Sequence, residues 1–148
     1  MKRKRVVLLG ATGSIGESAL KVAHDIPDRM EIVGVAANSN AEKLAAAANK
    51  TRARTVCLVD ESKIDILRGA LEYKAQIFVG EKGLCEIASL ADADMILIAI
   101  VGTGGLRPAL AAIEAGIRGA DAGRTVTSEE ARRLVEHWIS ELSIRNSR

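Results

Sequence analysis

Glycines at a regular spacing near the start of this chain could hold a phosphate group. The run Gly10-Ala11-Thr12-Gly13-Ser14-Ile15-Gly16 follows the short apolar segment Val6 to Leu9, and a helical pattern begins directly after it. Glycines between a strand and a helix let the backbone approach a ligand closely, and the first N–H groups and positive dipole end of the helix face an anion. The sequence therefore predicts a dinucleotide phosphate site at this turn.

The spacing of the glycines is also compatible with a purely structural turn. The spacing is G-x-x-G-x-x-G and not the stricter G-x-G-x-x-G, so a tight turn that merely needs glycine would give the same pattern. A nucleoside triphosphate loop is disfavoured, because no Gly-Lys-Ser/Thr follows. Ser14 and Glu17 form a capping-box pattern, which predicts that the helix begins at the same place.

The second predicted strand ends in neutral polar residues. Glu31 to Ala36 is rich in β-branched residues and leads into Asn38-Ser39-Asn40, where a dinucleotide fold meets the adenosine ribose. Sites that prefer NAD place an Asp or Glu there, whereas this tip would not repel a 2′-phosphate. We therefore expect NADP over NAD, with positive charge available from Lys43, Arg52 or Arg54.

A second glycine loop follows the most continuously apolar segment of the chain. Met95 to Ile100 predicts a central strand covered on both faces, and it leads into Val101-Gly102-Thr103-Gly104-Gly105 and a helix from Leu106 to Ala115. Ligands of parallel sheets bind outside the carboxyl ends of the strands, so this flexible loop is expected near the nicotinamide. A plain strand-to-helix connection is the alternative.

Strands and helices alternate along the whole first part of the chain. This order predicts an α/β fold, a doubly wound, mostly parallel, Rossmann-like sheet flanked by helices. The remaining expected elements are helices at Ala41–Ala48, Ser62–Leu71 and Gly83–Leu90 and strands at Thr55–Val59 and Ala75–Val79.

The alternation fails after Gly116. A further buried strand would be expected there, but Ile117 to Arg124 is polar and interrupted by glycine. From Thr127 an amphipathic helix is predicted, with Trp138 on its apolar stripe. We therefore expect a cofactor domain over residues 1–116 and a divergent tail over residues 117–148.

Composition limits the remaining possibilities. The 148 residues suffice for one domain, and a net charge of +2 gives no basic field for nucleic acid. No segment is long enough to span a membrane. Cys57 and Cys85 have no metal or redox spacing, which favours buried thiols in a reducing cytoplasm, and His24 and His137 have no ligand cluster around them.

Two runs give the chain a family resemblance. Together with the glycine run, Ala37 to Asn40 and especially Ala99 to Gly116 resemble the amino-terminal domain of 1-deoxy-D-xylulose 5-phosphate reductoisomerase. The resemblance implies an NADPH-dependent, usually homodimeric enzyme of the non-mevalonate isoprenoid pathway, which needs Mg²⁺ or Mn²⁺. It converts a small phosphorylated sugar, 1-deoxy-D-xylulose 5-phosphate, to 2-C-methyl-D-erythritol 4-phosphate.

The resemblance also implies roles for individual residues. Thr12, Gly13, Ser14 and Ile15, with Gly10 in the same turn, would hold the pyrophosphate. Asn38, Ser39 and Asn40 would hold the ribose phosphate. The residues that would lie along the cofactor are Ala99, Ile100, Val101 and Gly102.

The chain departs from the family after Gly116. Counted without gaps, the family's Asn-Lys-Glu falls on Gly123, Arg124 and Thr125, and none of the three is kept. The metal ligands and the substrate site belong to a later catalytic domain, so we expect no catalytic or metal-binding residue here and no turnover by this chain alone. A truncation and a change of reading frame would both explain the departure.

Other function classes fit less well. A short-chain reductase needs Tyr-x-x-x-Lys, but Tyr73 is followed directly by Lys74. A semialdehyde dehydrogenase needs a catalytic cysteine in a suitable loop, and neither cysteine lies in one. A module that binds NADP or a partner without catalysis stays open as the alternative.

Overall fold

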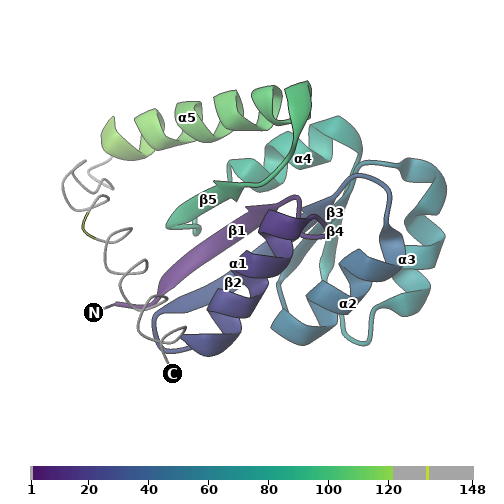
Figure 1. The fold of residues 1–148 in the computed structure, drawn as a ribbon. Coiled ribbons are helices and arrows are strands. Elements are labelled where there is room, and N and C mark those ends of the chain that lie inside the picture. Colours follow the sequence, from purple (N-terminus) through teal and green to yellow (C-terminus); the bar gives the residue numbers. More distant parts are fainter. Residues whose placement is uncertain (1, 122–132, 134–148) are drawn as a thin grey trace. The chain divides into compact units, whose positions relative to one another are not determined.

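A five-stranded parallel sheet with the order β4-β3-β2-β1-β5 forms the centre of the computed structural model (Figure 1). The strands are β1 (Lys4–Leu9), β2 (Met30–Ala37), β3 (Thr55–Leu58), β4 (Gln76–Val79) and β5 (Met95–Ile98). Every pair of neighbouring strands is parallel. The α/β doubly wound fold expected from the alternation is thereby confirmed.

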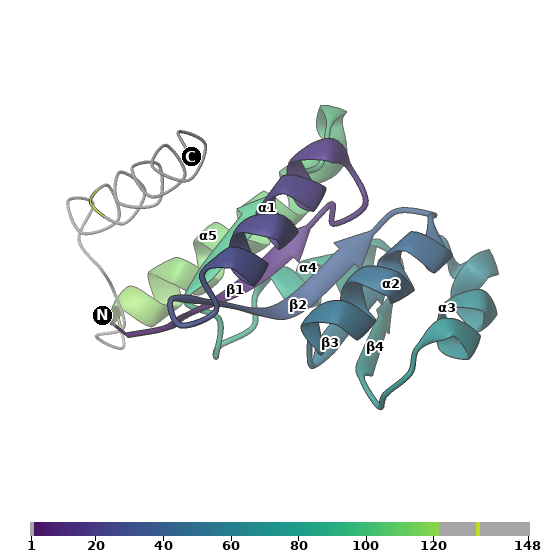
Figure 2. The same cartoon turned by 60° about the horizontal axis from the view of Figure 1, so that its bottom comes forward.

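Helices connect the strands and cover both faces of the sheet. They are α1 (Ser14–Asp25), α2 (Ala41–Thr51), α3 (Ile64–Ala70), α4 (Gly80–Ala88) and α5 (Leu106–Asp121), with short 3₁₀ turns η1 (Glu61–Lys63) and η2 (Gly102–Gly105). Figures 1 and 2 show α1 and α2 over one face and α4 over the other. Several boundaries differ from the sequence-based expectation. Helix α2 continues past Ala48 to Thr51, α3 begins at Ile64 and not at Ser62, α4 spans Gly80–Ala88 and not Gly83–Leu90, and α5 continues past Ala115 to Asp121.

The structure describes residues 2–121 and 133. The chain divides into two units, Met1–Ala115 and Gly116–Arg148. The sheet and the loops at its ends belong to the first unit. The amphipathic helix expected from Thr127, with Trp138, lies outside the described residues.

The core lies on both sides of β1. Residues 6–9 are fully buried, and because side chains alternate along a strand, Val7 and Leu9 share one face. On that face they form a cluster with Cys57, Leu84 and Ile87, which joins β3 and α4 to the centre of the sheet. Because β1 is buried, the position at which the glycine loop leaves the sheet is fixed.

The prediction of a central, fully covered position for β5 was wrong for the described sheet. β5 is the last strand in the order, beside β1 alone, and its four residues are only partly buried. An apolar run indicates cover on the two faces of a strand, but it carries no information on how many strands lie beside it.

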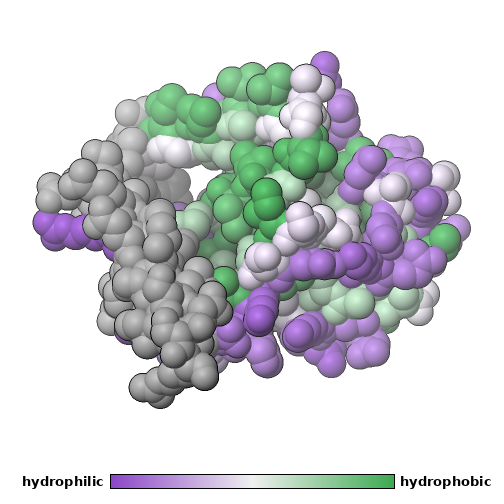
Figure 3. Space-filling model, in the orientation of Figure 1, coloured by the Kyte–Doolittle hydropathy of each residue, from purple (hydrophilic) through white to green (hydrophobic). Residues whose placement is uncertain are grey.

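Helix α5 has apolar residues on two sides. Pro108 is buried and Ala112 packs against the core cluster, whereas Leu106, Leu110 and Ile113 are 58–62% exposed. Figure 3 shows this apolar surface along α5. Exposed Arg107 and Glu114 lie on the same helix, so its surface is apolar in part and charged in part.

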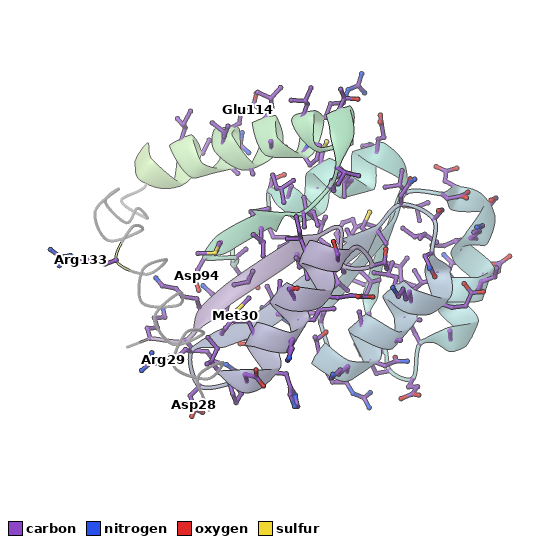
Figure 4. All side chains as sticks on the ribbon, in the orientation of Figure 1. Asp28, Arg29, Met30, Asp94, Glu114 and Arg133 are labelled. Atoms are coloured by element: carbon purple, nitrogen blue, oxygen red, sulfur yellow. The ribbon has the colours of Figure 1, made fainter. Side chains whose placement is uncertain are left out.

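An ion pair fastens β1 to the start of β5. The backbone N–H of Arg5 donates to Asp94 at 2.8 Å, and its guanidinium donates to both carboxylate oxygens at 3.2 and 3.3 Å. Partial burial alone would raise the pKa of Asp94, but the hydrogen bonds and charge of Arg5 outweigh it, so the pKa lies below its ordinary value. Figure 4 shows Asp94 at the edge of the sheet where Met30 begins β2.

We expect the Arg5–Asp94 ion pair to make the stability of the fold depend on pH. A carboxylate with a lowered pKa in the folded state adds stability above its unfolded pKa, about 3.9, which is lost as the pH falls through the folded value. Asp94→Asn should therefore lower the Tm by a few degrees at pH 7 and leave it unchanged near pH 2. Asp28→Asn, at the same edge of the sheet (Figure 4), is the control and should leave the Tm unchanged at both pH values. Equal Tm losses for Asp94→Asn at both pH values would contradict the pH dependence.

Candidate functional site

Three loops meet at the carboxyl edge of the sheet. The loops after β1, β2 and β5 leave the same edge because the strands are parallel, and β1 lies between the other two strands. The chain passes outward from β1 through β2, β3 and β4 and then returns to β5 on the other side of β1. Such a reversal of strand order is where doubly wound sheets bind their ligands.

Packing requires two of the three glycines in the first loop. Gly10 has a φ of 87°, and a Cβ atom there would lie 2.5 Å from the carbonyl oxygen of Ala99. A Cβ atom at Gly16 would lie 2.1 Å from the carbonyl oxygen of Gly10. These distances are far too short for real contacts, so Gly10 and Gly16 let the first loop pack against the third loop and against α1. For these two positions the alternative explanation, a turn that needs glycine, is correct.

Gly13 differs from both, because the space beside it is open. The nearest atom to a Cβ placed there would be the Gly10 carbonyl oxygen at 3.8 Å, and the φ of −83° suits any residue. Gly13, Ser14 and Ile15 are exposed. Within the described part of the chain, no backbone acceptor is found for the N–H groups of Thr12, Ser14 and Ile15. This open turn, with free donors at a helix start, has the form that a pyrophosphate needs.

The capping-box prediction was wrong. Gly13 is the N-cap of α1 and no side chain caps the helix. Ser14 is already helical, and its carbonyl oxygen accepts a hydrogen bond from the Ser18 hydroxyl at 3.0 Å. The Glu17 carboxylate pairs instead with the ammonium group of Lys43 on α2. Without a side-chain cap, the helix start stays open to an external anion.

The tip after β2 is held by its own hydrogen bonds. Asn40 is the N-cap of α2, and its side-chain oxygen accepts from the backbone N–H of Lys43 at 3.0 Å. The carbonyl oxygen of Asn38 accepts from the N–H of Asp60 at 2.7 Å. Asn38 and Asn40 are exposed and Ser39 is partly buried. The tip thus presents neutral polar groups beside the glycine loop.

One carboxylate does lie close to the tip. Asp60 follows β3 and caps η1, where its oxygen accepts from the Ser62 hydroxyl at 2.6 Å and from the Ser62 N–H at 3.1 Å. The hydroxyl of Ser62 lowers the pKa of Asp60. Both bonds are accepted by Oδ1 of Asp60, and the residues of the tip itself, Asn38, Ser39 and Asn40, carry no acid.

The structure separates the three candidate cations. Lys43 lies at the site, and its ammonium group donates to the carbonyl oxygen of Thr12 at 3.3 Å. Arg52 caps the far end of α2 and lies over the Tyr73 ring at 5.1 Å. Arg54 precedes β3, at the opposite edge of the sheet, and pairs with Asp92 at 2.6 Å. Of these three cations, Lys43 is the one with a contact to a residue that is predicted to hold phosphate.

The loop after β5 contacts the glycine loop directly. The N–H of Ala99 donates to the carbonyl oxygen of Leu9 at 2.7 Å, which continues the pairing of β5 with β1. Ala99 and Ile100 are partly buried, whereas Val101 is 88% exposed and Gly102 has open space around it. Residues 102–105 form a 3₁₀ turn where a flexible loop was expected. The four predicted residues therefore follow β5 next to the glycine loop.

Sequence reasoning did not find the role of Glu17. It was expected to cap α1, yet it forms the charged contact between the first and second loops. The signal was present in the chain, since an acid and a base occupy the first turns of consecutive helices that start at the same edge of the sheet. Parallel strands bring two such turns close together.

The cysteines and the possible metal ligands among the described residues form no second functional site. Burial raises the pKa of the Cys57 thiol to about 12, and Cys85 is only partly buried, not buried as expected. No three His, Cys, Asp or Glu side chains come together to hold a metal ion in residues 2–121 and 133. Over the same residues, no helix is both long and apolar enough to cross a membrane.

Comparison with known proteins gives one consistent result. The family model for 1-deoxy-D-xylulose 5-phosphate reductoisomerase matches residues 6–122. The reductoisomerases of Crocosphaera subtropica and Haemophilus ducreyi are 42% and 39% identical to this chain over 116 residues, which is 76% of this chain and 29% of each relative.

Solved structures agree with the sequence matches. The reductoisomerase of Zymomonas mobilis in complex with NADPH superposes with a TM-score of 0.72 at 37% identity, over 77% of this chain and 30% of that one. A reductoisomerase structure with NADPH, fosmidomycin and magnesium gives 0.68 at 34% identity, over 76% of this chain and 28% of that one. The chain thus spans less than a third of the length of these relatives.

Proposed function

Because this chain belongs to the 1-deoxy-D-xylulose 5-phosphate reductoisomerase family, we propose that it is the part of such an enzyme that binds NADPH. The whole enzyme rearranges and reduces 1-deoxy-D-xylulose 5-phosphate to 2-C-methyl-D-erythritol 4-phosphate, with NADPH supplying the hydride. The observation that carries the proposal is the open space at Gly13, beside free helix N–H groups and at the reversal of strand order.

Each loop has a separate task in this proposal. The turn of Gly10, Thr12, Gly13, Ser14 and Ile15 holds the pyrophosphate through backbone N–H groups and the dipole of α1. The tip of Asn38, Ser39 and Asn40 holds the ribose and its 2′-phosphate. The cofactor then extends across β1 toward the third loop, formed by Ala99, Ile100, Val101 and Gly102.

The remaining properties of the whole enzyme are part of the same proposal. The full-length protein would act in the cytoplasm as a homodimer on its phosphorylated sugar substrate. It would use Mg²⁺ or Mn²⁺, which polarises the substrate oxygens. A solved relative is in complex with magnesium. The residues described in this chain contribute no cluster of ligands to that ion.

Titration of the chain with NADPH and NADH tests the proposed cofactor. The tip offers hydrogen-bond donors and no carboxylate to the 2′ position, so we expect NADPH to bind about tenfold more tightly, the ratio that corresponds to one charge-assisted hydrogen bond. Fluorescence of the reduced nicotinamide on binding gives both Kd values. Equal or reversed affinities would contradict the role of the Asn38-Ser39-Asn40 tip, and no binding of either would contradict the proposed function.

A further inference from the structure

Lys43 connects the two loops that hold the phosphates in the proposed function. Its ammonium group donates to the Thr12 carbonyl oxygen of the glycine loop at 3.3 Å and pairs with the Glu17 carboxylate on α1. Its backbone N–H is bound by Asn40, the last residue of the ribose tip. The side chain therefore extends from the tip of the second loop to the first loop.

Glu17 introduces a negative charge at a place otherwise built for anions. It lies in the first turn of α1, close to the open N–H groups at Ser14 and Ile15. An acid in the first turn is favourable for the helix, but it also competes with any bound phosphate. Its pairing with Lys43 neutralises both charges.

The magnitudes favour an exchange of partners. Both side chains of the pair are 52% exposed, and an exposed ion pair contributes little to stability. A phosphate monoester carries about −1.5 to −2 charges and three strong acceptor oxygens, so its attraction for an ammonium group is greater than that of a carboxylate. Little free energy is needed to release Lys43 from Glu17.

We propose that Lys43 exchanges Glu17 for the 2′-phosphate when NADPH binds, and that Glu17 limits NADPH affinity by competing for Lys43. This inference rests on the proposed function and adds a specificity-determining pair to it. NADH lacks the 2′-phosphate, so it leaves the pair intact. Selection of NADPH thus depends on the Lys43 ammonium group.

Two single variants of the full 148-residue chain test the exchange. Lys43→Met removes the cation but keeps the length of the side chain, and it should weaken NADPH binding about tenfold more than NADH binding. Glu17→Gln removes the competitor and should tighten NADPH binding roughly threefold more than NADH binding. Continued binding of NADH shows that each variant still folds.

The double variant and a charge control complete the experiment. In the Lys43→Met background, Glu17→Gln should no longer change the ratio of the NADPH and NADH Kd values, because there is no cation left to compete for. Glu42→Gln changes the net charge by the same amount at an exposed neighbour of Lys43, and it should leave the ratio of the two Kd values unaltered.

The outcomes separate this inference from the proposed function. If the parent chain binds neither cofactor, the proposed function fails and the inference fails with it. If the parent binds NADPH but Lys43→Met leaves its Kd unchanged, only the inference is overturned. It is also overturned if Glu17→Gln tightens NADH as much as NADPH, since that result indicates general repulsion at the pyrophosphate and not an exchange.

Discussion

A Gly16→Ala chain is expected to be less stable than the parent by about 3 kcal/mol, at the upper end of the usual cost of overpacking. The new Cβ atom would lie 2.1 Å from the carbonyl oxygen of Gly10 and 2.8 Å from the Cα atom of Ala11. Both are backbone atoms of a turn fixed to β2 by hydrogen bonds of 2.9 Å to Ala36. They cannot move aside, so α1 must shift away from the sheet.

Urea denaturation followed by circular dichroism measures this effect. The matched control is Gly69→Ala in α3, where a new Cβ meets nothing within 4 Å. That change should stabilise the chain by up to about 1 kcal/mol, because alanine is the better helix former. If the urea midpoint of Gly16→Ala equals that of the parent, the close packing of α1 on the glycine turn is wrong.

Replacing Gly13 should have the opposite effect to Gly16→Ala: the fold should stay as stable as in the parent, but cofactor binding should be weakened. In Gly13→Asn the side chain enters the open space beside the turn, and asparagine is a preferred N-cap. It would cap the first N–H groups of α1 and occupy the approach of the pyrophosphate. We expect an unchanged or slightly higher Tm and at least about tenfold weaker binding of NADPH and NADH alike.

The two cofactors provide the internal control for Gly13→Asn. A loss confined to NADPH would mean that the substitution acts at the 2′-phosphate and not at the pyrophosphate. Unchanged affinity for both would show that neither pyrophosphate approaches the backbone here, and the assignment of the first loop would then be wrong. A fall in Tm would show that Gly13 serves the fold, as Gly10 and Gly16 do.

The sequence by itself determined the layout of this protein. Alternation of apolar strands with helical patterns predicts a parallel sheet, and in such a sheet all strand-to-helix loops leave from one edge. For this reason the sequence predicts one site formed by the glycine run after β1, the Asn38-Ser39-Asn40 tip after β2 and the glycine loop of residues 101–105 after β5. The motifs also sufficed to indicate the family.

Only the tertiary structure decided what the individual residues do. Gly10 and Gly13 look alike in the sequence, but the carbonyl of Ala99, far away in the chain, leaves no space for a side chain at the first and does not approach the second. Lys43 was one of three equivalent cations until packing placed it over Thr12.

Two predictions failed for the same physical reason. Glu17 fits a capping box, but it pairs with a cation from another helix. β5 has the composition of a central strand, but it is the last strand of the described sheet. Local patterns report how a segment prefers to fold and which of its faces are apolar, whereas contacts between distant segments depend on the path of the whole chain.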